Sequence, residues 1–379
     1  MKFHTSREKA LESLEVFINK DIVNYSSKRN YDFGPIDRKN VSCLSPYISH
    51  RLIDEYEISK KVLSKHPYSK VEKYIQEIYW RVYWKGWLEL RPKVWSDFVE
   101  DLNIINESKI YHEATNGQSK IECFNDWVKE IKEYNYLHNH ARMWFASIWI
   151  FTLGLPWQKG AEFFMKYLLD GDAASNTLSW RWVAGLQTKG KNYLAQTWNI
   201  NKFLDKKYQN IELIENAYPI VDNREYKISP IDIPKSNSRN DYLIVFENDL
   251  SDESIKINDY KKIYFILLNN SYRSLKLDSK VLKYKKNIML EKLNKTNDNL
   301  VLVEENKIEK LLENSKNFDI VYPSIGENMS FLKKMIKEKK LNINFITRDE
   351  DLFCWSFSNK GYFNFKSNIP KILEKFQLN

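Results

Sequence analysis

The chain has 379 residues, enough for two domains of ordinary size, and its 43% hydrophobic and 29% charged residues are typical of a soluble globular protein. The net charge of +9 permits a polyanionic partner, but the basic excess is spread along the chain and equally fits a solvated surface. The most apolar run, residues 143–157, is shorter than the roughly 18 residues of a membrane span and predicts a buried helix. The N-terminus has no secretory apolar core, and the three cysteines have no metal or disulfide spacing, so we expect a cytoplasmic protein without a bound metal.

The first half of the chain has helical periodicity. Apolar side chains recur at helical spacing in residues 10–17, and Trp80, Trp84 and Trp87 follow at i, i+4 and i+7. This pattern predicts an all-α domain over residues 1–205. Residues 206–239 are polar and contain three prolines, which predicts a linker that lies over the surface.

The last third of the chain changes to short apolar runs of strand length. These runs are 242–246, 262–268, 300–303, 318–322 and 343–347. Helix-like segments such as 329–339 separate some of them, and this alternation predicts a mainly parallel sheet with helices on both faces. No glycine-rich nucleotide fingerprint accompanies the sheet. The expected fold class is therefore α plus α/β in two domains, with a smaller Rossmann-like domain at 240–379.

Residues 138–143 contain the first unusual group of polar side chains. Asn139, Arg142 and Met143 are spaced at i, i+3 and i+4, so they share one face of a helix. An amide, a fixed cation and a thioether together suit a ligand of mixed polarity. A core helix with a satisfied arginine is the alternative.

Residues 170–182 form the most informative segment. Asp170 and Asp172 precede a helix that carries Asn176 and Trp180. A buried Asp170 beside a heterocycle needs a cation to stay ionised, and Arg142 is the natural partner. The alternative is an aspartate N-cap before a core helix, which explains one aspartate but not the whole segment.

Two weaker motifs precede these segments. Glu77 and Trp80 at i, i+3 place a carboxylate beside an aromatic face, although an amphipathic helix with a solvated glutamate is the favoured explanation of this motif on its own. Tyr25 and the turn 42–47 offer hydroxyls and backbone N–H groups ahead of a helix, an arrangement that cradles phosphates. A plain helix cap is the more common meaning of such a turn.

In this order the motifs resemble the flavin domain of the DNA photolyase/cryptochrome family, over residues 7 to about 203. The match is closest to a bacterial photolyase-like branch in which the FAD-binding helical domain comes first. The resemblance implies a bent FAD, an Arg142–Asp170 ion pair beside its ring and Asn176 near the flavin N5. The cofactor-binding residues that it implies are Tyr25, Ser42, Leu44, Ser45, Tyr74, Arg81, Arg142, Asp170, Asp172 and Asn176.

The resemblance also implies a substrate and a reaction. Electron transfer from photoexcited FADH⁻ would split cyclobutane pyrimidine dimers in ultraviolet-damaged DNA, and Glu77 and Asn176 would contribute to catalysis. The 6–4 photoproduct branch has histidines where this chain has Asn139 and Met143, which favours the cyclobutane substrate. The residues expected to bind the dimer are Glu77, Trp80, Asn139, His140, Met143 and Trp182.

Departures from the family pattern are His140, Val41 and Arg181, which replace Arg, Thr and Gln. Trp180 and Trp157 match the inner members of the family's electron-transfer chain, and Trp95 is the candidate for the outer, surface member.

The resemblance extends weakly to the C-terminal part. Residues 349–365 resemble the end of the α/β antenna domain that normally precedes the flavin domain, so we expect a permuted order here. No residues fix an antenna chromophore. We expect a monomer that binds damaged DNA and no membrane. A cryptochrome-like blue-light photoreceptor without repair activity is the main alternative, and a flavoprotein with thermal redox chemistry is another.

Overall fold

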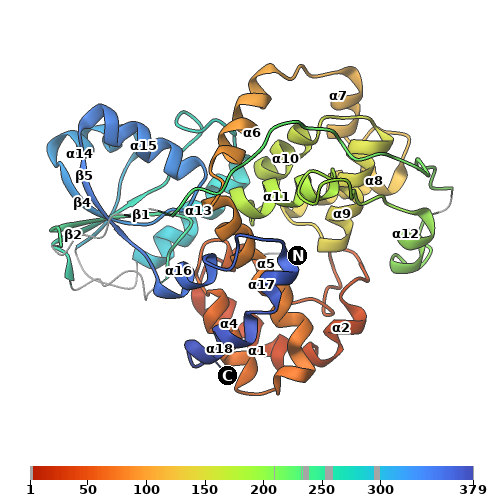
Figure 1. Ribbon diagram of the computed structural model, residues 1–379, viewed down its shortest axis with the longest axis horizontal. Helices are drawn as coiled ribbons and strands as arrows, with labels where there is room; N and C mark the ends of the chain where they lie inside the picture. The colour runs from red at the N-terminus through yellow and green to blue at the C-terminus, as the bar shows by residue number, and fades with distance from the viewer. Residues whose placement is uncertain are drawn as a thin grey trace.

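The structure is a computed structural model that describes residues 3–208, 210–231, 233, 239–251, 259–293 and 299–378. Helices account for nearly all regular structure before residue 204, as the periodicity predicts (Figure 1). They are α1 (Arg7–Lys20), η1 (Ile22–Asn24), α2 (Tyr25–Lys28), α3 (Ser45–Ile48), α4 (Glu55–Leu63), α5 (Tyr68–Glu89), α6 (Lys93–Ile104), α7 (Lys109–Thr115), α8 (Glu122–Tyr134), α9 (Asn139–Ser147), η2 (Ile148–Thr152), α10 (Trp157–Tyr167), α11 (Ala173–Val183) and α12 (Thr197–Phe203).

Helix α5 is the longest helix of this part and runs through its centre. Its 22 residues bury side chains on several sides, including Val71, Ile75 and Val82. A helix that is buried all round needs close neighbours, and Gly86 provides one contact: a Cβ there would lie 2.7 Å from the Trp355 ring. The apolar run 143–157 is also buried, across α9, η2 and the start of α10. Among the described residues, no helix combines the length and apolar character needed to cross a membrane.

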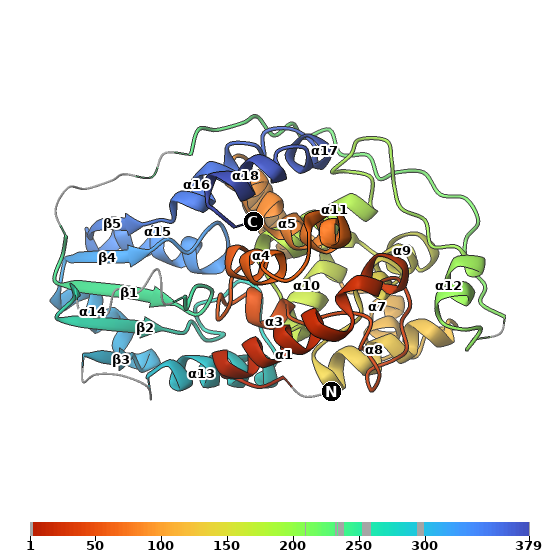
Figure 2. The ribbon, with the colours of Figure 1, turned by 90° about the horizontal axis from the view of Figure 1, so that it is seen from below.

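The C-terminal part contains the predicted parallel sheet. All its neighbouring strands pair in parallel, in the order β3-β2-β1-β4-β5. The strands begin and end within two residues of the predicted runs: β1 (Tyr242–Phe246), β2 (Lys262–Ile266), β3 (Leu300–Leu302), β4 (Asn317–Val321) and β5 (Asn342–Ile346). Helices α13 (Ser279–Leu293), η4 (Glu305–Lys307) with α14 (Ile308–Asn314), and α15 (Glu327–Lys339) connect them. The sheet lies at one end of the molecule and the helical part at the other (Figure 2).

The last three helices leave the sheet and return to the helical part. They are α16 (Asp349–Trp355), α17 (Tyr362–Lys366) and α18 (Ile369–Lys375), and both views place them beside α4 and α5 (Figures 1 and 2). Asp351 on α16 bonds both Nη atoms of Arg51, at 2.6 and 2.7 Å, and accepts from the Tyr56 hydroxyl. The division at 205 and 240 remains a prediction, because this tail belongs in sequence to one part and packs on the other.

Residues 210–231 are extended and cross the helical part, as expected of a surface linker (Figure 1). Backbone hydrogen bonds of 2.9 Å attach them, from Ile220 N to Ala184 O and from Ser229 N to Leu90 O. We call residues 210–231 the strap. Residues 209, 232 and 234–238 of the predicted linker lie outside the described residues.

Replacing Gly160 with alanine is expected to lower the free energy of unfolding by about 1–3 kcal/mol, because the added methyl overpacks a dense contact. Its Cβ would lie 2.2 Å from Trp180 Cη2, so the indole has to move. Urea denaturation followed by tryptophan fluorescence measures the change. Gly361→Ala is the control: among the described residues, apart from its two chain neighbours, no atom lies within 4 Å of that Cβ, and we expect a change of a few tenths of a kcal/mol. Equal effects of the two variants would contradict this packing.

Candidate functional site

An ion pair between Arg142 and Asp170 forms the centre of the candidate site, as the sequence predicts. Arg142 comes from the second turn of α9, and Asp170 lies in the loop before α11. The guanidinium donates to both carboxylate oxygens, at 3.1 and 2.9 Å, and Ser45 Oγ donates to the same carboxylate at 2.5 Å. Burial would raise the pKa of Asp170, but the charge and hydrogen bonds of Arg142 and the bond from Ser45 lower it below its ordinary value. The site therefore holds an ionised carboxylate in a buried place.

A second ion pair lies next to the first. Arg81 of α5 donates to Asp172 at 2.7 Å, and Asp172 also caps α11 by accepting from Ser175 N at 2.9 Å. Burial would raise the pKa of Asp172, but the charges of Arg81 and Lys85 lower it. The capping alternative is thus correct for Asp172, and it does not exclude a ligand role for a carboxylate that is still partly exposed.

The turn before α3 has a backbone suited to anions. Cys43 has a φ of 52°, in the left-handed region, and Leu44 after it is right-handed with φ −87° and ψ −5°. Adjacent residues of opposite hand direct successive N–H groups to one side, a known anion-binding arrangement. Ser42 and Ser45 flank this turn and are partly exposed, whereas the Leu44 side chain is buried. The backbone of the turn, more than the leucine side chain, is therefore suited to phosphate.

Aromatic and amide groups complete the predicted cofactor residues. Tyr25 meets Tyr74 edge-on, with ring centres 5.0 Å apart, and the Tyr74 hydroxyl is one of the groups that interact with Ser42. The Asn176 amide donates to Ala161 O at 2.9 Å, which fixes its orientation on α11.

Several buried polar atoms of α11 have no hydrogen-bond partner among the described residues. They include Ser175 Oγ and Trp180 Nε1. Buried polar groups are nearly always satisfied, so unpaired donors beside two ion pairs and an anion-binding turn indicate a missing ligand. Phosphate-binding backbone, fixed charges and aromatic rings are together the groups that a flavin dinucleotide requires. The residues therefore fit FAD.

The two tryptophans predicted to hold the substrate are each stacked on a tyrosine. Trp80 lies parallel to Tyr362 of α17, with ring centres 3.4 Å apart at 12°, and Trp182 stacks on Tyr193 at 5.6 Å. Both tryptophans remain partly exposed. Sequence reasoning missed Tyr362, although the segment that contains it stood out as a motif.

The other predicted substrate residues differ in exposure. Glu77 is partly exposed and pairs with Lys73 at 2.7 Å. Asn139 is exposed at the start of α9, and Met143 is partly buried one turn later. His140 instead points inward: it is buried and its ring stacks on Trp144 at 4.2 Å. The structure does not bring His140 to the same surface as Asn139.

The predicted electron-transfer residues lie on α10 and α11. Trp180 is fully buried against Gly160, and Trp157 is buried at the start of the same α10 helix. The prediction that Trp95 is a surface member is wrong: Trp95 is 4% exposed and its Nε1 donates to Ser330. Phe98, which is stacked on Trp157 at 5.4 Å, lies next to Trp95 in the helix and cannot be oxidised as readily as an indole.

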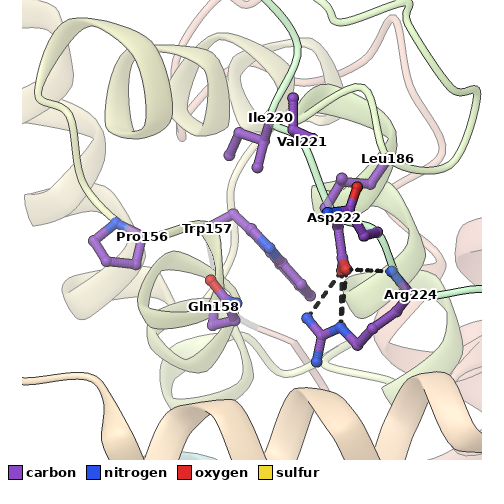
Figure 3. Close-up of a pocket in the computed structure, with 9 residues that line it drawn as sticks. Pro156, Trp157, Gln158, Leu186, Ile220, Val221, Asp222 and Arg224 are labelled. Carbon is purple, nitrogen blue, oxygen red and sulfur yellow. Dashed lines mark hydrogen bonds and ion pairs between the residues drawn. The ribbon is translucent and has the colours of Figure 1, made fainter.

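A cavity of about 400 Å³ opens over Trp157. The strap forms its outer wall, with Ile220 and Val221 above the indole and Arg224 bonded to Asp222 beside it (Figure 3). Of the predicted electron-transfer tryptophans Trp157 and Trp95, it is therefore Trp157 that borders this cavity.

A buried cluster at the interface of the two parts was also missed from sequence. Lys285 of α13 lies 3.1 Å from His50 Nε2 and 3.6 Å from Glu247. Burial lowers the pKa of His50 to about 3, and the positive charge of Lys285 adds to that effect. This cluster lies within electrostatic range of the candidate site, because the charge of Asp172 is among those that act on the pKa of Lys285. Among the described residues, no group of His, Cys, Asp and Glu is arranged to hold a metal ion.

Comparison with known proteins agrees with this geometry. A family model described as the FAD binding domain of DNA photolyase matches residues 74–248. The deoxyribodipyrimidine photo-lyase of Agrobacterium fabrum is 30% identical over 183 residues, 46% of this chain and 37% of that protein. The protein of the same name from Buchnera aphidicola is 26% identical over 251 residues, 59% of this chain and 52% of its own. The chain thus spans about half or less of these relatives.

Two solved structures are also similar over part of the chain. A class III photolyase from Agrobacterium tumefaciens has a TM-score of 0.46 at 25% identity, covering 52% of this chain and 42% of its own. A Synechocystis cryptochrome has a TM-score of 0.48 at 19% identity, covering 54% and 44%.

The helical fold, its paired charges and its anion-binding turn define a flavin-binding protein whose cofactor is FAD. Residues 74–248, a little under half of the chain, are similar to the FAD binding domain of DNA photolyase.

Proposed function

We propose that the chain repairs DNA as a light-dependent photolyase and splits cyclobutane pyrimidine dimers. The observation that carries the proposal is that the Arg142–Asp170 pair lies in the same helical part of the chain as the partly exposed tryptophans Trp80 and Trp182. The photo-lyase names of the curated relatives support it.

The chain's own residues would hold the cofactor and tune it. The turn at Ser42–Ser45 would receive the phosphates, Asp172 the ribose or the edge of the ring, and Asn176 the neighbourhood of the flavin N5. Bound FAD would supply light absorption and one-electron chemistry. Charge and hydrogen bonding from the Arg142–Asp170 pair would favour one redox form of the ring.

The same residues would recognise the damaged DNA. The two covalently linked bases of the dimer must leave the stack to reach a buried cofactor, and extrusion costs less for damaged bases than for intact ones. Trp80 and Trp182 would receive the bases by stacking, worth about 1–3 kcal/mol per base. Tyr362 fixes the plane of Trp80 by covering one face, which prepares it for such a contact. Glu77 and Asn139 would bond the base edges.

The direct test is repair of an oligonucleotide that contains one cyclobutane thymine dimer. Under blue light, the FAD-reconstituted protein with reduced flavin is expected to restore the dimer to two thymines, and in the dark it is not. Intact dimers after illumination would contradict repair. If flavin photoreduction persisted in that case, the photoreceptor alternative would replace it.

Trp182→Ala is expected to weaken binding to the dimer-containing oligonucleotide about tenfold, because one stacking surface is lost. The flavin content should be unchanged. Trp198→Ala is the matched control, since Trp198 is 64% exposed and lies on α12, away from the predicted pocket. Equal affinities of the Trp182 variant and the parent in a filter-binding assay would show that the pocket is misassigned.

A further inference from the structure

The Arg181 guanidinium lies close to both the Trp157 indole and the phenol of Tyr226. The Arg181 Cζ atom is 5.9 Å from the centre of the Trp157 ring and 5.2 Å from the centre of the Tyr226 ring. The two rings are therefore no further apart than the sum of these distances, which is within range for electron transfer between aromatic side chains. Tyr226 comes from the strap, and it is partly exposed whereas Trp157 is buried.

The phenol of Tyr226 has a carboxylate beside it. Burial raises the pKa of Tyr226 to about 12 against the opposing charges of Arg181 and Arg224, and Asp97 of α6 adds to the rise. The phenol therefore keeps its proton at rest. Asp97 is 6% exposed, and its Oδ2 accepts no hydrogen bond from the described residues. This oxygen lies 3.9 Å from Arg224 Nη1, too far for a hydrogen bond, so it can still take up a proton.

The positive charge of Arg181 decides the direction of electron flow. Arg181 is buried, and at this distance its charge disfavours a cation on the Trp157 indole. A tyrosine that loses an electron and a proton together carries no charge as a radical, so it avoids this repulsion. The state with Tyr226 oxidised is therefore more stable than the state with Trp157 oxidised.

We propose that Tyr226 is the outermost electron donor of this chain and that Asp97 accepts its proton. The phenol gives one electron to the oxidised Trp157 and its O–H proton to the Asp97 carboxylate. The products are a neutral indole, a neutral tyrosyl radical and a protonated Asp97. A thiol in solution then returns one electron and one proton to Tyr226, and Asp97 releases its own proton.

This assignment rests on the proposed function, because light-driven oxidation of the Trp180–Trp157 pair creates the oxidised Trp157. Tyr226 of the strap thus takes the role of outermost electron donor, which the buried Trp95 cannot fill. A rival route also exists in the structure: Trp149 lies 6.2 Å from Trp180, and Tyr111 lies 5.8 Å from Trp149. The test has to separate the two tyrosines.

Electron paramagnetic resonance during blue illumination of the FAD-reconstituted protein, without added thiol, identifies the radical directly. The parent is expected to give a tyrosyl radical that Tyr226→Phe removes, leaving a tryptophan radical that decays at least tenfold faster. Tyr226→Trp should restore a long-lived radical with a tryptophan spectrum, which a purely structural role would not do. Asp97→Asn should slow formation of the tyrosyl radical several-fold, and dithiothreitol should quench it.

Tyr208→Phe is the matched control, because the Tyr208 hydroxyl also pairs with an aspartate, Asp126 at 2.9 Å, but in the described part of the structure no ring contact joins Tyr208 to the electron-transfer tryptophans Trp157 and Trp180. Its radical signal should equal that of the parent. An unchanged tyrosyl radical in Tyr226→Phe would overturn the proposal, and its loss in Tyr111→Phe would assign the rival route. Flavin bleaching in the same samples reports on the proposed photochemistry separately, so absent bleaching would count against the proposed function.

Discussion

Replacing Asp351 with alanine is expected to lower the free energy of unfolding by about 3–5 kcal/mol, because it leaves Arg51 with much of its charge uncompensated in the interior. Both side chains are buried. Without Asp351, Arg51 keeps a 3.9 Å ion pair with Glu55 and a 3.3 Å contact with Asp249, which is itself bonded to Arg348 at 2.6 and 2.7 Å. Asp351 also anchors α16, so the tail of helices from α16 onward should loosen from α4 and α5.

Urea denaturation measures the loss, and hydrogen exchange locates it. Asp349→Ala is the control, since Asp349 is exposed in the first turn of the same helix and should cost less than about 1 kcal/mol. A loss below 1 kcal/mol for Asp351→Ala would mean that these buried charges do not join the two parts of the chain.

Replacing Arg142 with alanine is expected to abolish flavin retention during purification. The variant leaves the Asp170 carboxylate buried without its bonded cation. The pKa of Asp170 should then rise, because only the Ser45 hydrogen bond and the charge of Arg81 still oppose the effect of burial. A neutral or displaced Asp170 no longer orders the site around Ser45. Absorbance between 350 and 500 nm, about the usual flavin range, measures bound cofactor, and circular dichroism verifies the fold.

Two further variants make this result interpretable. Asp170→Asn removes the charge with little change in volume and should also lose flavin, even if it folds better than Arg142→Ala. Arg7→Ala breaks another two-bond ion pair, with Glu57 at 2.8 and 2.9 Å, outside the site, and should retain full flavin. If both Arg142→Ala and Asp170→Asn retained flavin, the result would show that this ion pair is not part of the flavin-binding site.

Features set by neighbours in sequence were predictable. An apolar run predicts each strand. The pairing of Arg142 with Asp170 follows from chemistry, because a buried carboxylate needs a cation to stay ionised. Only one of the two contacts of Asp172 was predictable. Its capping of α11 is local in sequence, whereas its ion pair with Arg81 joins α5 to α11.

Contacts between distant segments were not predictable. Tyr362 stacks on Trp80, and Asp351 bonds Arg51 from a position 300 residues away, through a tail whose path no local pattern reveals. The error at Trp95 has the same origin: spacing placed it in a helix, but the neighbouring sheet domain covers that helix through Ser330.

The central claim is that the helical domain holds one FAD between its paired charges. The most direct measurement is the flavin content of the purified chain, from its absorption spectrum and from chromatography of the cofactor released by acid. We predict one FAD per chain, bound again after removal and return of the cofactor. A folded chain that stays colourless in excess FAD would contradict the account.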